Sequence, residues 1–287
     1  MKTLILLLLL ISSTSVLTQT SSYGFGSSSG TYTEITGGTV LGITANDEQV
    51  FNNSTAGETG PQTDIGFPIG FSFNFNGIVY DRFAVNNNGW IKLGTGSFTI
   101  GATTTPISYS GTTGFENIIS PMGRDLQGQT GSELSYLLTG SSPNRVLVVQ
   151  WKNYRKFGAT TGENYNFQIR LNENNYVIQF VYGSVTTANT STSSTNNTTQ
   201  LGIRGLLNSD YKNRTTTSSW SSSSTGTINT ATMRLTTSVK PASGLTYSFT
   251  PANMSYVSST SVIADTSSVK KNSVNNPVIR IQVVVSG

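Results

Sequence analysis

The acidic side chains are the groups of this chain best suited to catalysis, because the chain contains no His and no Cys. Ser-His-Asp triads, thiol nucleophiles and the usual zinc sites are therefore excluded within it. Glycoside hydrolysis needs two carboxyl groups about 5–10 Å apart, and Asp125 with Glu163 would be such a pair if the fold joined them. We favour the alternative to a catalytic pair, in which the acids lie in solvated loops and Arg124 pairs with Asp125 to stabilise a turn. We therefore predict no catalytic residue.

Aromatic side chains are the groups suited to carbohydrate binding, because their flat apolar faces pack against sugar rings. Trp220 is flanked by serines and Tyr154 lies in the basic segment 152–156, so we expect both in exposed loops. Trp90 and Trp151 lie in or beside strong strand patterns, which favours core packing for these two. The candidate ligand-binding residues are Trp220, Tyr154, Trp90 and Asp125.

Hard cations are a further class of ligand. Asn46, Asp47 and Glu48 are consecutive oxygen-bearing side chains in a polar segment, and loop oxygens of this kind bind Ca²⁺. They lack the spacing of an EF-hand loop. We therefore predict no metal site and no cofactor, and a loop calcium site is the alternative.

The stretch 68–94 predicts the scaffold that must position these groups. Phe71, Phe73 and Phe75 alternate with polar residues, which places three rings on one face of a strand. The Asn-Gly pair that follows favours a tight hairpin turn. Two more strand-like runs follow, separated by an Asn-Asn-Asn-Gly turn. The pattern predicts a three-stranded antiparallel meander with one apolar face.

Other segments extend the same pattern. The runs 145–151, 165–171 and 176–182 are strongly β-forming and predict a second hairpin system with central strands covered on both faces. Segment 31–43 predicts two short strands, and 95–116 a long loop with one edge strand. No segment shows helical periodicity, so the fold class is all-β, an antiparallel β-sandwich or jelly-roll-like domain. One core should contain Phe71, Phe73, Phe75, Trp151, Phe167, Ile169 and Phe180.

The chain divides into three parts. Residues 1–22 have the basic start, short apolar run and polar flank of a signal peptide, with cleavage near Thr18 or a few residues beyond. Residues 23–251 form the sandwich domain, and 252–287 are a linker and the first strands of an incomplete second β domain. No later segment is apolar enough to span a bilayer. We expect a protein that is secreted or at the cell surface, with no membrane span in the mature chain.

Charge excludes one class of partner. Charged residues are 10% of the chain, and the net charge of +4 is spread thinly, without a run of Lys or Arg that would follow a phosphate backbone. Nucleic acid is therefore not an expected partner. The low charge favours a neutral or weakly acidic ligand, and we expect its site on loops at one end of the sandwich.

Four motifs over roughly residues 30–250 carry a resemblance: GFPIGFSFNFNGIVYDRFAVNNNGWIKLG, ENIISPMGRDL, PNRVLVVQWKNYR and NFQIRLNENNYVIQFVYG. In this order they resemble the N-terminal β-rich module of large secreted Bacteroidetes proteins, which often precedes further β domains and a type IX secretion tail. The tail SYVSSTSVIADTSSVKKNSVNNPVIRIQVVVSG resembles the start of the domain N-terminal to BNR-repeat neuraminidases. Sialidase Asp boxes are not found in the chain, so the resemblance does not imply sialidase activity.

Two classes of function remain from these observations. The first is a secreted, non-catalytic recognition or adhesion module, glycan-binding and N-terminal in a larger cell-surface or secreted protein. The second is a structural spacer domain without a small ligand. A third interpretation makes the chain the accessory N-terminal region of a secreted, sialidase-like glycoside hydrolase.

Overall fold

The structure is a computed structural model that describes residues 20–42, 49–159, 162–188, 198–216, 219–221, 224–225 and 229–252. Strands make up 52% of it and helix 1%, which confirms the all-β prediction. Within these ranges no helix has the length and hydropathy needed to cross a membrane. The expected signal sequence before residue 20 and the expected second domain lie outside the described residues.

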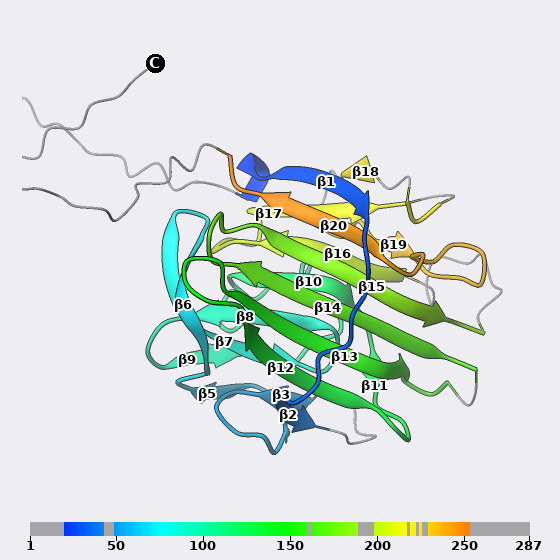
Figure 1. Cartoon of the computed structure of the whole chain (residues 1–287), viewed down its shortest axis with the longest axis horizontal. Helices are drawn as coiled ribbons and strands as arrows, with labels where there is room; N and C mark the ends of the chain where they lie inside the picture. The colour runs from blue at the N-terminus through cyan, green and yellow to red at the C-terminus, as the bar shows by residue number, and fades with distance from the viewer. Residues whose placement is uncertain are drawn as a thin grey trace, which may run out of the picture. The chain divides into compact units, whose positions relative to one another are not determined.

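Two antiparallel sheets form the sandwich, and Figure 1 shows one in front of the other. Sheet A consists, in spatial order, of β1 (Gly24–Ser29), β20 (Leu245–Thr250), β15 (Ile178–Thr186), β14 (Asn164–Asn172), β13 (Val146–Lys156), β12 (Glu133–Thr139) and β2 (Thr39–Gly42), with β11 (Leu126–Gln127) paired to β13. Sheet B consists of β18 (Ser224–Thr225), β17 (Tyr211–Thr215), β16 (Thr198–Arg204), β10 (Ile118–Gly123), β8 (Trp90–Gly94), β7 (Ile78–Asn86), β3 (Gln49–Phe51) and β4 (Glu58–Thr59), with β19 (Met233–Arg234) on β16 and β6 (Phe67–Phe75) on β7. A separate pair joins β5 (Gln62–Asp64) to β9 (Phe98–Ile100).

The predicted meander is confirmed as β6, β7 and β8. Phe75 pairs with Ile78 across the hairpin, and Asn76 and Gly77 take φ angles of 57° and 80° in the turn. Such positive angles suit Asn and Gly better than other residues. Along β6 buried and more exposed residues alternate, as the period of two requires.

The core lies between the two sheets, and its predicted composition is confirmed. One buried cluster contains Phe71, Phe73, Phe75, Trp151, Phe167, Ile169 and Phe180. The indole of Trp151 stacks on Phe167, with ring centres 5.0 Å apart and planes inclined by 15°. Aromatic rings from both sheets therefore fill the interior.

The Asn-Asn-Asn-Gly turn at 86–89 is buried and joins the two sheets. Asn88 Oδ1 accepts a hydrogen bond from the Leu126 N–H (2.8 Å). The carbonyl of Asn87 accepts one from Trp151 Nε1 (3.1 Å), so a core residue of sheet A is tied to a turn of sheet B. A turn of polar residues is stable here because these groups find partners in the interior.

The segment 95–116 is a long connection, as predicted, and it contains the short strand β9. It lies on the outer face of sheet B, where it closes a second buried cluster: Val50, Ala84, Trp90, Ile100, Ile107, Phe115 and Ile118. Gln200 Oε1 accepts hydrogen bonds from the N–H groups of Ile107 (2.9 Å) and Ser108 (3.1 Å). This connection is therefore a packed layer over sheet B.

The first described residues, beginning at Thr20, pack onto the domain. Residues Thr20–Ser22 form a 3-10 turn, η1, although the sequence assigns them to the signal peptide. The N–H and the hydroxyl of Thr20 both donate to Asp210 Oδ1 (2.7 and 2.9 Å), and Thr20 is fully buried. The described domain therefore includes Thr20, which belongs to its packed structure.

The prediction of two short strands in 31–43 is wrong in part. The structure has one strand, β2, and residues 31–36 instead run across the outer face of sheet A, as the blue segment between β1 and β2 in Figure 1 shows. We call residues 31–36 the strap. The strap does not pair with a neighbouring strand, because its backbone is hydrogen-bonded to side chains of sheet A instead.

Candidate ligand-binding groove

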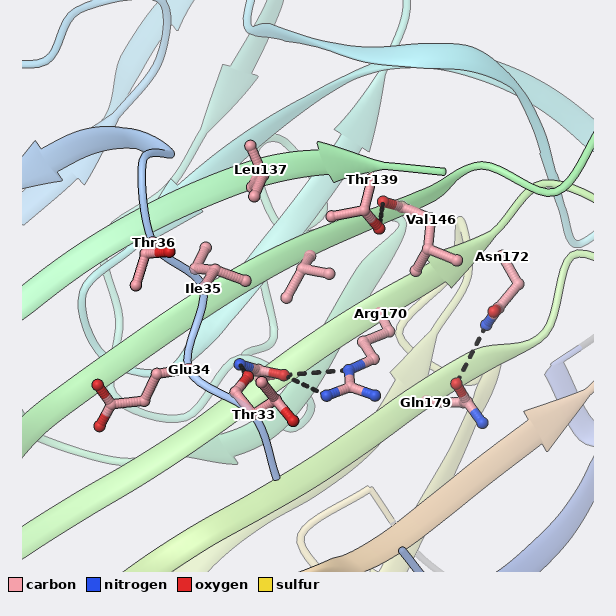
Figure 2. A pocket seen from close by; sticks show the side chains of 12 residues that line it. Thr33, Glu34, Ile35, Thr36, Leu137, Thr139, Val146, Arg170, Asn172 and Gln179 are labelled. Carbon is pink, nitrogen blue, oxygen red and sulfur yellow. Dashed lines mark hydrogen bonds between the residues drawn. The ribbon is translucent and has the colours of Figure 1, made fainter. Parts of the chain in front are cut away.

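A groove of about 400 Å³ lies between the strap and the outer face of sheet A (Figure 2). Every second side chain along β13 and β14 belongs to the core cluster, so the side chains between them form the outer face. The groove is lined by Thr33, Glu34, Ile35, Thr36, Leu137, Thr139, Val146, Val148, Gln168, Arg170, Asn172 and Gln179. Four strands and the strap therefore contribute to one concave site.

Two fully buried amides fix the position of the strap. Gln150 Oε1 accepts hydrogen bonds from the Ile35 N–H (3.0 Å) and from Gln168 Nε2 (2.8 Å). Gln168 Nε2 also donates to the carbonyl of Thr33 (2.7 Å). The wall of the groove is thus held by hydrogen bonds to two buried side chains, which favours a preformed site.

Arg170 is the cationic group in the groove. Its Nε and Nη2 both donate to Gln168 Oε1 (3.0 and 2.8 Å), which orients the guanidinium. Within the described residues no carboxylate lies at ion-pair distance from it, and Nη1 makes no hydrogen bond. Burial lowers the pKa of Arg170, but an arginine side chain stays charged at neutral pH. The groove therefore presents a fixed positive charge.

Neutral polar groups and an apolar floor surround this charge. Leu137, Val146 and Val148 supply the floor. Asn172 Nδ2 donates to Gln179 Oε1 (3.4 Å), and Figure 2 shows these two amides at the end of the groove next to Arg170. Hydroxyl groups of three threonines complete the lining. This arrangement suits the binding of a polar ligand with one anionic group.

The groove is not built for two-carboxylate chemistry. Among the described residues that line it, Glu34 is the only carboxylate, and it pairs with Lys152 Nζ at 2.8 Å. Hydrolysis of a glycosidic bond needs a second carboxyl group nearby.

Trp220 and Tyr154 are not exposed, so this part of the sequence prediction is wrong. Trp220 is 2% exposed, and its ring lies edge-on to that of Tyr182 with ring centres 5.8 Å apart. Its carbonyl accepts a hydrogen bond from the Tyr247 hydroxyl (2.5 Å). Tyr154 lies within β13 and is also 2% exposed. The serines beside Trp220 and the lysines near Tyr154 indicated a surface position, but both aromatic rings belong to the core cluster.

Trp90 is buried in the second cluster, where its Nε1 donates to the carbonyl of Thr103 (3.0 Å), which confirms core packing. Asp125 lies partly buried between β10 and β11, and its carbonyl accepts a hydrogen bond from the Phe157 N–H (3.0 Å). None of the four candidates lines the groove. The structure therefore does not bring them together at this site.

Glu163, the possible catalytic partner of Asp125, is buried and holds local structure. Its carboxylate accepts hydrogen bonds from the Tyr165 hydroxyl (2.5 Å), the Lys156 N–H (3.0 Å) and the Thr187 hydroxyl (2.9 Å). Three donors therefore fix the position of this carboxylate. The alternative calcium residues, 46–48, lie outside the described residues.

The groove residues were missed by sequence reasoning, although one signal was present. In 165–171 the aromatic and aliphatic residues alternate with Asn166, Gln168 and Arg170, which places a polar row on the outer face. The strap that covers this row comes from a distant part of the chain. No local pattern in residues 31–36 indicates that they cross the sheet.

Replacing Trp220 with Ala should lower the free energy of unfolding by about 3 kcal/mol, because a buried indole is lost and a cavity remains. Urea denaturation of the variant and the wild type measures this change. Replacing the exposed Phe157, a matched aromatic on the surface, should change stability by less than about 0.5 kcal/mol. Equal stability of the Trp220 variant and the wild type would contradict the burial described here.

Comparisons with known proteins identify a family. No curated protein and no solved structure matches the chain. A family model described as NIDO related matches residues 22–251, which is most of the chain and includes both sheets and the groove. The chain therefore belongs to the NIDO-related family.

Proposed function

We propose that this protein is an extracellular adhesion module that binds a carboxylate-bearing saccharide in the groove beneath the strap. The NIDO-related family is typical of extracellular proteins and indicates an adhesion-like module. The single observation that carries the ligand class is Arg170, a charged side chain in the groove without a carboxylate partner among the described residues.

The chemistry of the groove suits an acidic sugar. Guanidinium groups recognise carboxylates through charge-assisted hydrogen bonds, and the Nη1 of Arg170 is available for one. Sugar hydroxyls both donate and accept, as do the amides of Asn172 and Gln179 and the threonine hydroxyls. Apolar C–H faces of a sugar ring would lie on Val146 and Val148.

The site differs in place and in kind from the one expected from the sequence. It lies on a strand face covered by the strap, whereas we expected loops at one end of the sandwich. No aromatic residue is among the described residues that line it, so hydrogen bonds and charge replace ring stacking. Its volume of about 400 Å³ is in the usual range of small-ligand sites. Shallow polar contacts predict a millimolar to micromolar dissociation constant, about −4 to −8 kcal/mol.

The resemblance to large secreted Bacteroidetes proteins extends this proposal to the whole protein. The described domain would then act as the N-terminal recognition module of a longer secreted or cell-surface chain. In the third interpretation, the domain would hold a saccharide near a downstream sialidase-like domain. The sequence of the reading frame that follows the chain distinguishes these cases.

A glycan array tests the proposed ligand class. We expect the wild-type chain to bind sialylated or uronic-acid glycans and to bind their neutral counterparts at least tenfold less, since the carboxylate contributes about 1.4 kcal/mol or more. Arg170→Gln should remove this preference while the circular-dichroism spectrum is unchanged.

The matched control is Arg82→Gln, which removes an arginine on β7 of sheet B and should keep full binding. Two results would contradict the proposal: an absence of binding to every acidic glycan, or an acidic preference that survives in Arg170→Gln.

A further inference from the structure

A second, smaller cavity of about 40 Å³ lies among the short strands β3, β4 and β5. It is lined by Val50, Asn52, Ser54, Ala56, Glu58, Gln62, Thr63 and Asp64. Six of these eight side chains carry an oxygen atom, and none of the described lining residues is positively charged. A space of this size holds a single water molecule or a single ion.

Asn52 supplies a buried oxygen that needs a partner. The residue is 5% exposed, and its Nδ2 donates to the carbonyls of Phe98 (3.0 Å) and Gln62 (3.3 Å). These two bonds fix the orientation of the amide. Its Oδ1 is buried and accepts no hydrogen bond from any described residue. An orphaned oxygen of this kind is costly unless water or a cation satisfies it.

Two carboxylates line the same cavity without a cationic partner. Asp64 Oδ1 accepts hydrogen bonds from the Ile65 N–H (2.7 Å) and from Asn53 Nδ2 (3.4 Å), while its Oδ2 accepts none from the described residues. Glu58 lines the cavity from β4, and neither acid forms an ion pair within the described ranges. Both carboxylates therefore remain available as oxygen ligands for a hard cation.

We propose that this cavity binds Ca²⁺, with Asp64, Glu58 and the Oδ1 of Asn52 as protein ligands and with water in the remaining positions. In the described part of the chain, no group of three or more His, Cys, Asp or Glu side chains is arranged for a metal. The site therefore depends on neutral oxygens beside two carboxylates, a set that suits the hard and geometrically tolerant Ca²⁺ better than Mg²⁺. This site is separate from the groove and goes beyond the proposed function.

The ion would join β4 and β5 to the end of β3. Asn52 follows β3 directly, Glu58 is in β4 and Asp64 ends β5, so one cation would connect three short segments. Few carboxylate ligands predict a weak site, with a dissociation constant of about 10⁻⁴–10⁻³ M, as in other extracellular modules. Calcium at extracellular concentration would then stabilise this side of sheet B.

Calcium titration of the full chain, after removal of divalent ions with a chelator, tests the proposal. We expect a heat of binding by calorimetry, and a rise of a few degrees in the thermal midpoint at about ten times the dissociation constant. Asp64→Asn and Glu58→Gln keep the side-chain shape and should weaken Ca²⁺ binding at least tenfold. Both residues are exposed, so both variants should fold, which circular dichroism checks.

The matched control is Asp81→Asn, an exposed acid on β7 of the same sheet that does not line the cavity, and it should bind Ca²⁺ like the wild type. Three results would overturn the proposal. They are an unchanged wild-type midpoint with no heat of binding, undiminished binding in both cavity variants, and an equal response to Mg²⁺. The first would show that water alone fills the cavity.

Discussion

Replacing Trp151 with Ala is expected to lower the free energy of unfolding by about 5 kcal/mol, at the upper end of core substitutions. Trp151 is fully buried and stacks on Phe167 in the centre of sheet A. Its Nε1 also donates to the carbonyl of Asn87 in the buried turn of sheet B, so the substitution removes a link between the sheets. Urea denaturation followed by tryptophan fluorescence and circular dichroism measures the loss.

The variant Trp151→Phe separates the contribution of ring packing from that of the hydrogen bond to Asn87. It keeps an aromatic ring against Phe167 but leaves the Asn87 carbonyl without its donor, which should cost about 1–3 kcal/mol beyond the smaller ring. For Trp151→Ala, the expected loss is a large part of the roughly 5–15 kcal/mol of stability of a typical domain, so this variant should be close to unfolded at 37 °C.

A loss below about 1 kcal/mol in Trp151→Ala would be incompatible with the packing described here.

The second large effect is expected at Arg204, which is fully buried on β16 and, among the described residues, donates only to backbone carbonyls. Its Nη1 and Nη2 reach the carbonyls of Tyr109 (2.6 Å) and Gly111 (2.7 Å). Longer hydrogen bonds from Nη1 reach the carbonyls of Pro106 and Ile107. Arg204→Ala leaves these acceptors without a donor and should destabilise the protein by about 4–5 kcal/mol.

The same substitution should release the 95–116 segment from sheet B. Limited proteolysis is then expected to cut within this segment in Arg204→Ala but not in the wild type, because a cleaved segment must first leave its packed position. Arg82→Ala on the same sheet, whose side chain is 33% exposed, should change stability by less than about 0.5 kcal/mol. Wild-type protease resistance in Arg204→Ala would show that Arg204 does not hold this layer.

The individual strands and the core were predictable because they depend on local periodicity. The alternation in 71–75 and in 165–171, together with the Asn-Gly turn, determines which side chains face the interior, whatever the distant partners are. The core list is correct for this reason. Strand order and the two large sheets require long-range pairing, which no local pattern of this chain records.

The candidate site was not predictable in the same way. Trp220 has polar neighbours, and its burial against Tyr182 depends on tertiary packing that joins residues far apart in the chain. The strap is held by Gln150 and Gln168, whose partners lie more than a hundred residues away. Arg170 becomes a candidate only when the strap turns a flat sheet face into a groove. Its residue type alone does not distinguish a groove from a flat strand face.

The claim that the groove beneath the strap is the ligand site can be tested by blocking it. The chain has no Cys, so a single introduced thiol can be modified selectively. Thr36→Cys places that thiol in the groove on an exposed strap residue, and Ser72→Cys places it on β6, outside the groove. Each variant is measured on the acidic-glycan array before and after reaction with a bulky maleimide.

We predict that the unmodified variants both bind, that maleimide on Cys at position 36 abolishes binding, and that maleimide at position 72 leaves it unchanged. Loss at position 36 is expected because the reagent fills a space of about 400 Å³ that the saccharide must occupy. Undiminished binding after modification at position 36 would contradict the assignment of the groove as the ligand site.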